Sequence, residues 1–151
     1  MTRSRTRYDG LRAGAVAGVL GGAPSTAYAL LTGGDPLEAS RAAGTLLLPG
    51  EERRGRLLVA GLIAHVAISL GWGVVLARVL PRRRPLAAGA LAGVAIAALD
   101  LGVVGRRFPA IRRLPLGPQV ADHLAYGLVV AWELERRRSG PSPASRIPRL
   151  R

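Results

Sequence analysis

The sequence predicts an all-α protein, a transmembrane four-helix bundle with one short amphipathic surface helix. Four runs of Ala, Gly, Leu and Val fill most of the 151 residues, and clusters of arginine separate them. About 20 apolar residues, at a rise of ~1.5 Å each, match the ~30 Å hydrocarbon core of a bilayer. The 20 glycines and the low aromatic share of 4% are typical of close-packed membrane helices. The predicted spans are 11–32, 57–80, 86–105 and 119–135, within a single domain over 1–138.

The basic composition indicates a membrane rather than a nucleic acid as the partner. The net charge is +13, and all 22 basic residues are arginine, which we interpret as the coding bias of a high-GC bacterial genome. In a soluble chain such a charge favours nucleic-acid binding. Here the arginines fall at the ends of the apolar runs, and few aromatics are interleaved for base stacking. We therefore expect a lipid bilayer and no nucleic acid.

The motif content argues against an enzyme. Because the chain has no cysteine, disulfides, thiolate metal sites and cysteine nucleophiles are excluded. Walker-type loops, Gly-x-Ser-x-Gly elbows, dinucleotide fingerprints and HExxH spacings are also absent from the sequence. We expect no catalytic residue, no cofactor and no metal.

The first run combines a glycine stripe with a proline. Gly10, Gly14, Gly18 and Gly22 recur at every fourth position and place a bare stripe along one helix face, where a neighbouring backbone can approach closely. Pro24 follows, and because proline lacks an N–H and clashes with the preceding turn, we expect a kink or break there.

A cleaved signal peptide is the rival interpretation of this first run. The basic start, the short apolar region and the ending Ala27-Tyr28-Ala29 have that form. The glycine stripe makes a poor signal core, however, and the apolar run continues through Leu31. Whether this helix is retained or cleaved stays open.

Residues 33–50 predict a short surface helix. Asp35-Pro36-Leu37-Glu38 has the form of a helix start, with an Asp cap, Pro in the first turn and an acid three residues after the cap. Pro49-Gly50 ends the segment, which is too short to span a bilayer. We expect a weakly amphipathic helix that lies on the membrane surface or packs back onto the bundle.

The remaining connections are short or basic. The turn Pro81-Arg82-Arg83-Arg84-Pro85 is so tight that the second and third runs are predicted to form an antiparallel hairpin. A basic, proline-rich loop over 106–118 precedes the fourth run. Residues 139–151 are rich in Pro, Ser and Arg without a core-forming pattern, and predict a disordered basic tail.

The arginine distribution predicts the orientation. The N-terminal tail, the 78–84 turn and the C-terminal tail together hold fourteen arginines, against eight in the two other loops. Since cytoplasmic segments carry the excess of positive charge, we expect a multi-pass protein of a bacterial cell membrane with both termini in the cytoplasm.

Polar residues interrupt the runs at one level. With this orientation His65, Asp100, Asp122 and His123 all lie about 6–12 Å below the outer boundary, at ~1.5 Å per residue. The break expected at Pro24 also falls in the outer half of the bilayer. Ionisable residues in a membrane are costly and normally face the bundle interior or water. The predicted intramembrane polar cluster consists of His65, Asp100, Asp122, His123, Ser25, Ser69 and Tyr126.

Small residues share helix faces with this cluster. His65 and Ser69 lie at i+4 spacing between Gly61 and Gly73, so His65 falls on a stripe that should face a neighbouring helix. In the third run the glycines share a side with Asp100. The predicted helix-packing residues are Gly14, Gly18, Gly22, Gly61, Gly73, Gly89 and Gly93.

Other charged residues have simpler interpretations. Asp122 is expected to be an N-cap or the partner of Arg106 or Arg107. Glu133 and Glu135, beside the arginines at 136–138, are expected to form a solvated interfacial charge cluster.

Several roles for the polar cluster stay open. Its members could hydrogen-bond one another and hold helices together, conduct protons or ions, bind a small ligand, or hold a metal or catalytic site. The preferred function is a non-enzymatic structural or interaction protein that packs with itself or with a larger membrane partner, and the glycine stripe is the expected contact face, inside the bundle or between copies. The alternative is a small proton- or ion-coupled transporter, or a ligand-binding membrane protein, that uses the His/Asp cluster.

Several strings resemble a group of small uncharacterised integral membrane proteins of actinobacteria. The resemblance covers roughly residues 10–138, and it implies a four-helix membrane protein of bacterial source without adding catalytic residues. The strings that carry it are Ala23-Pro24-Ser25-Thr26, Gly33-Gly34-Asp35-Pro36-Leu37, Arg41-Ala42-Ala43-Gly44-Thr45-Leu46-Leu47-Leu48-Pro49, His65 with Ser69-Leu70-Gly71-Trp72, Leu99-Asp100-Leu101-Gly102, and Gln119-Val120-Ala121-Asp122-His123-Leu124-Ala125-Tyr126-Gly127.

Overall fold

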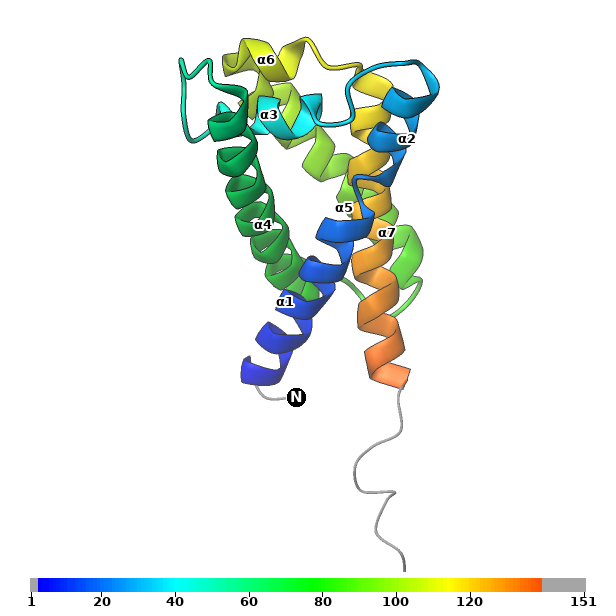
Figure 1. The fold of residues 1–151 in the computed structure, drawn as a ribbon. Coiled ribbons are helices and arrows are strands. Elements are labelled where there is room, and N and C mark those ends of the chain that lie inside the picture. The colour runs from blue at the N-terminus through cyan, green and yellow to red at the C-terminus, as the bar shows by residue number, and fades with distance from the viewer. Residues whose placement is uncertain (1–2, 140–151) are drawn as a thin grey trace, which may run out of the picture.

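The computed structural model describes residues 3–139, and in this range the regular structure is entirely helical (Figure 1). From residue 140 onward, the predicted basic tail lies outside the described residues. The helices are α1 (Arg3–Leu20), α2 (Ala23–Leu31), α3 (Glu38–Gly44), α4 (Arg54–Val79), α5 (Pro85–Leu99), the π-helical turn η1 (Asp100–Val104), the 3₁₀ turn η2 (Gly105–Arg107), α6 (Pro109–Arg112) and α7 (Leu116–Ser139).

Three helical stretches in the described part of the chain are long and apolar enough to cross a membrane. They are Thr6–Leu31, Arg54–Val79 and Pro85–Arg107. Their long apolar side chains largely face outward, as Leu31, Val19 and Leu91 do at 87%, 82% and 72% exposure. The fourth predicted span corresponds to α7, which is long enough but is not among these three apolar stretches.

The packing order of the long helices differs from their order in the chain. α1 packs against α4 and α7, and α5 packs against α7. The N-terminal end of α1, the C-terminal end of α7 and the turn between α4 and α5 lie at one end of the molecule, whereas α3 and α6 lie at the other (Figure 1). α4 and α5 run antiparallel as predicted, but they are not a packed pair. The predicted antiparallel hairpin is therefore present, but its two helices do not pack on each other, because each helix packs on α1 or α7 instead.

Glycines allow the backbones of α1 and α4 to touch. A Cβ atom at Gly73 would overlap the carbonyl oxygen of Gly10 and, at 2.6 Å, the Cα atom of Gly14. A Cβ at Gly18 would lie 3.0 Å from the side chain of Ser69. The stripe of α1 is thus occupied by α4 of the same chain.

The same kind of contact joins α5 to α7. A Cβ at Gly89 would lie 2.5 Å from the carbonyl oxygen of Gly127, and one at Gly93 would overlap the backbone of His123. Gly61 faces the carbonyl oxygen of Ser40 in α3. Six of the seven predicted packing glycines therefore face another element at close range.

Gly22 is the exception. A Cβ at this position would meet no atom within 4 Å. The residue lies in the turn between α1 and α2 rather than on a helix face, so its predicted packing role is wrong. The predicted break in the first span is present, at residues 21–22, and Pro24 falls in the first turn of α2, where a missing N–H costs little.

The short helix α3 packs back onto α4. Ala42 and Gly44 are buried, and α3 begins at Glu38, later than the predicted cap at Asp35 implies. The Asp35 carboxylate accepts a hydrogen bond from the N–H of Leu37 at 2.9 Å and pairs with Arg41. These two contacts hold the pKa of Asp35 below its ordinary value. The side chain therefore closes the turn before α3 instead of capping the helix.

The close contact of α1 with α4 predicts a strong position dependence for glycine substitutions. Gly73→Ala should destabilise the protein by about 1–3 kcal/mol, because the new methyl group overlaps the α1 backbone. Gly71→Ala is the matched control on the same helix, since a Cβ there meets no atom within 4 Å. The measurement is unfolding in mixed micelles of dodecyl maltoside and SDS. Equal stability of the two variants would contradict the observed contact.

Candidate functional site

A cavity of about 310 Å³ lies among α1, α2, α4, α5 and α7, and α3 and α6 border it at their end of the molecule. Ligand sites in proteins commonly start at about this size. Ile68 of α4 and Val104 of η1 both line the cavity and are 42% and 38% exposed, so the cavity is open to the surface. The structure places all seven members of the predicted polar cluster on its wall, namely Ser25, His65, Ser69, Asp100, Asp122, His123 and Tyr126.

The break in the first span explains the position of His65. At the end of α1, backbone carbonyls lose the N–H partners that a continuous helix would supply. Nε2 of His65 lies 2.8 Å from the carbonyl oxygen of Gly18. Because a carbonyl only accepts, Nε2 carries the proton and donates it. His65 therefore satisfies the C-terminal side of the break from α4.

Asp122 satisfies the other side of the break. Its Oδ1 accepts a hydrogen bond of 2.8 Å from the backbone N–H of Ser25, in the first turn of α2. That N–H is among the donors that a helix start leaves without an intrahelical partner. Asp122 is thus a cap, as one expectation held, but it caps α2 from α7. The expected pairing with Arg106 or Arg107 is wrong.

His123 and Asp100 form a direct pair across the cavity wall. Nδ1 of His123 lies 2.7 Å from the carbonyl oxygen of Gln119, so Nδ1 carries a proton and donates. Nε2 lies 3.4 Å from Oδ2 of Asp100. A contact between these two atoms requires a proton on one of them, either as imidazolium with carboxylate or as neutral imidazole with carboxylic acid. Asp100 begins the π-helical turn that continues α5, a deviation often found at functional sites.

Tyr126 and Ser69 join α7 to α4 at the wall of the cavity. The hydroxyl of Tyr126 donates to the carbonyl oxygen of Ser69. Ser69 is only 6% exposed because it also packs against the glycine stripe of α1. Among the described residues, no buried side-chain nitrogen or oxygen lacks a hydrogen-bond partner. The cluster is therefore a satisfied network, which also holds the helices around the cavity.

The described residues contain no group of three or more His, Asp or Glu side chains arranged to hold a metal ion. The cavity instead offers acceptor oxygens and imidazole groups next to apolar walls formed in part by Trp72 and Ile96. Trp72 also packs against the buried core. This arrangement suits non-covalent binding of a small molecule.

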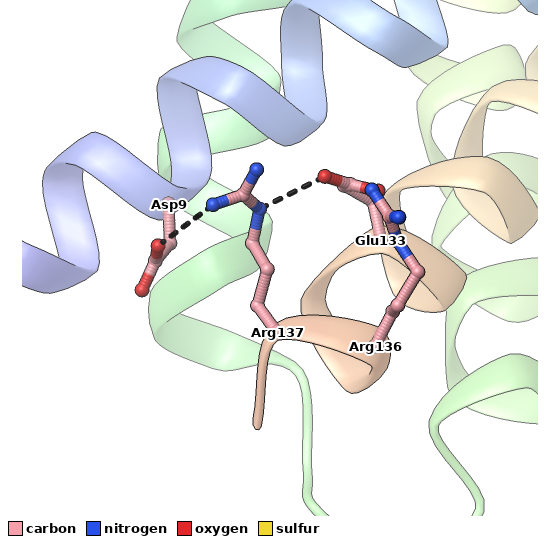
Figure 2. Close-up of polar contacts among 4 residues, drawn as sticks. All are labelled: Asp9, Glu133, Arg136 and Arg137. Atoms are coloured by element: carbon pink, nitrogen blue, oxygen red, sulfur yellow. Dashed lines mark hydrogen bonds and ion pairs between the residues drawn. The ribbon is translucent and has the colours of Figure 1, made fainter. Parts of the chain in front are cut away.

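A second polar cluster ties α1 to α7 at the end of the molecule near the termini (Figure 2). Glu133 is 1% exposed, and its two carboxylate oxygens accept hydrogen bonds from Arg136 at 2.8 Å and from Arg137 at 2.9 Å. Arg137 also contacts Asp9 of α1 at 3.5 Å. Arg136 lies over the ring of Trp132, 5.2 Å from its centre.

The burial of Glu133 corrects the expectation of a solvated charge cluster. Glu135 is exposed, as expected, whereas Glu133 points into the bundle. A signal for this was present, because arginines three and four residues after Glu133 can both reach its carboxylate on a helix. Sequence reasoning missed that Glu133 shares the inner face of α7 with Val130, which is fully buried.

No protein-family model, curated protein or solved structure matches the chain. The resemblance to the actinobacterial group therefore stays a prediction.

The buried carboxylate predicts unequal effects of two neighbouring substitutions. Glu133→Ala should destabilise the protein by about 2–4 kcal/mol, because it leaves the partly buried Arg137 without its main partner. Glu135→Ala, two residues further along the same helix, should stay within about 0.5 kcal/mol of wild type. Unfolding in mixed micelles measures both. A change at Glu135 as large as that at Glu133 would argue against the network in Figure 2.

Proposed function

We propose that this chain is a multi-pass protein of a bacterial plasma membrane that crosses the bilayer four times, with both termini in the cytoplasm. The excess of arginines on one side supports the orientation. The common position of the N-terminal end of α1 and the C-terminal end of α7 supports an even number of crossings (Figure 1). The use of arginine for every basic residue and the resemblance stated above support a bacterial source.

The position of α7 supports its role as the fourth span. Its 24 residues correspond to about 36 Å at ~1.5 Å per residue, enough to cross the hydrocarbon core. Its polar groups contact partners within the chain: Asp122 binds Ser25, His123 contacts Asp100, and Glu133 binds two arginines. A helix that contacts α1, α2, α4 and α5 needs less apolar surface than one surrounded by lipid.

Within this membrane protein, the proposed activity is non-enzymatic binding of a small ligand in the cavity. The observation that carries the proposal is the convergence of polar side chains from four helical segments on one apolar-walled cavity of about 310 Å³. The competing role, self-association through the glycine stripe, loses support because Gly10 and Gly14 already contact Gly73 within the chain.

The crossing of α7 predicts a labelling pattern. Since the chain has no cysteine, each single cysteine substitution introduces the one thiol that a maleimide can label. In bacterial spheroplasts a membrane-impermeant maleimide should label Glu52→Cys and Arg113→Cys. It should label Arg83→Cys and Ser139→Cys only after the membrane is permeabilised. Labelling of Arg113→Cys and Ser139→Cys from the same side would refute the fourth span.

Ligand binding predicts a cavity-specific loss of affinity. The probes are 2-phenylethanol, phenylacetate and 2-phenylethylammonium, tested with protein in phosphatidylcholine nanodiscs. At least one probe should raise the thermal unfolding temperature, because a ligand that binds only the folded state stabilises it. Ile68→Trp fills the cavity and should abolish this shift. Leu62→Trp, an exposed position on α4 outside the cavity, should retain it.

Two results would overturn the binding proposal. One is that none of the three probes shifts the unfolding temperature of the wild-type protein. The other is that Ile68→Trp and Leu62→Trp respond alike, because the shift would then arise outside the cavity.

A further inference from the structure

The electrostatic character of the cavity is opposite to that of the rest of the chain. The protein carries a net charge of +13, and most of its ionisable side chains are arginines. Among the described residues, however, no arginine lines the cavity, whereas Asp100 and Asp122 both do. The two carboxylates are among only nine acidic residues in the sequence. The cavity therefore gathers two carboxyl groups of a positively charged protein, and His123 is paired with one of them.

The hydrogen-bond network leaves carboxylate acceptors for a ligand, beside the hydroxyl groups of Thr26, Ser40 and Ser69 and the amide of Gln119, which also line the cavity. The N–H of His65 is engaged with Gly18, and the Nδ1–H of His123 with Gln119. Of the two carboxylates, Oδ2 of Asp100 contacts His123 and Oδ1 of Asp122 binds Ser25. The second oxygen of each carboxylate retains acceptor capacity, because an ionised carboxylate accepts on both oxygens. A ligand that donates hydrogen bonds or carries positive charge matches this arrangement.

The other residues that line the cavity favour a ligand with an apolar part next to its charged group. Trp72, Ile68, Ile96 and Leu101 line the cavity together with the ring of Tyr126. Aromatic side chains attract cations through the negative charge of their π-faces as well as apolar groups through burial. Ile68 and Val104 line the cavity and are themselves exposed, so part of its rim is apolar.

From this combination we infer that the cavity binds an organic ammonium ion with an apolar, preferably aromatic, body. The ammonium group lies between Asp100 and Asp122 and donates hydrogen bonds to their second oxygens. The apolar part lies against Trp72 and the aliphatic wall. This inference rests on the proposed ligand-binding function and adds the chemical class of the ligand.

The test compares head groups on similar small aromatic bodies. Binding of 2-phenylethylammonium, 2-phenylethanol and phenylacetate is titrated at pH 7 in phosphatidylcholine nanodiscs, using the fluorescence of Trp72 in a Trp132→Phe background. Trp72 and Trp132 are the two tryptophans of the chain, so the remaining signal reports on the cavity wall. The ammonium probe should bind at least about tenfold more tightly than the alcohol, and phenylacetate should bind most weakly.

Substitution of the two aspartates tests whether they recognise the positive charge of the ligand. Asp100→Asn and Asp122→Asn should each weaken binding of the ammonium probe by about tenfold. Both should weaken the binding of 2-phenylethanol less than that of the ammonium probe, because an amide oxygen still accepts a hydrogen bond but no longer pairs with a positive charge. Retained alcohol binding also shows that the cavity persists in each variant. Glu52→Gln removes an exposed carboxylate outside the cavity and should leave all three affinities unchanged.

The outcomes separate this inference from the proposed function. If the alcohol binds as tightly as the ammonium and Ile68→Trp abolishes both, ligand binding stands and the preference for a cation is overturned. Tighter binding of phenylacetate, or an ammonium affinity that neither aspartate substitution changes, also overturns the preference. If none of the probes binds the wild-type protein, both proposals fail.

Discussion

The arrangement of this protein depends on the interruption of its first apolar helix. A break inside a membrane span leaves backbone carbonyl and N–H groups without partners, and each such group costs several kcal/mol in hydrocarbon. Here His65 of α4 binds the carbonyl of Gly18, and Asp122 of α7 binds the N–H of Ser25. Each of these two ionisable residues therefore satisfies a backbone group at the break in the first apolar helix. Their hydrogen bonds also determine where α4 and α7 lie relative to the break.

Close backbone contacts hold the helices together at some positions along their length, and polar contacts hold them together at others. Gly10, Gly14 and Gly73 bring α1 against α4, and Gly89 with Gly127 brings α5 against α7. At the end near the termini, Arg137 links Glu133 to Asp9 (Figure 2). α4 and α5 are each held by a different partner, so they remain apart although a short turn connects them. The cavity occupies part of the space that this separation leaves.

A satisfied polar network and a ligand site are compatible in this geometry. The contacts that hold the helices use one oxygen of each aspartate and the inward N–H groups of both histidines. These contacts leave carboxylate oxygens as acceptors beside apolar walls, and no arginine of the described residues lines the cavity. The same side chains can hold the bundle together and set the charge preference of its interior. Their structural role therefore accounts for the two aspartates that line the cavity.

The sequence by itself determined the helical class, three of the apolar spans, the break near Pro24 and the residues that gather at the cavity. These features follow from local properties: run length, helical spacing, the missing N–H of proline and the cost of burying ionisable groups. Tertiary structure decided the partners. Asp122 caps a helix nearly a hundred residues away in the chain, Glu133 is buried because its face of α7 meets α1, and α4 separates from α5. Periodicity assigns a side chain to a face, but the packing of distant backbones decides what that face meets.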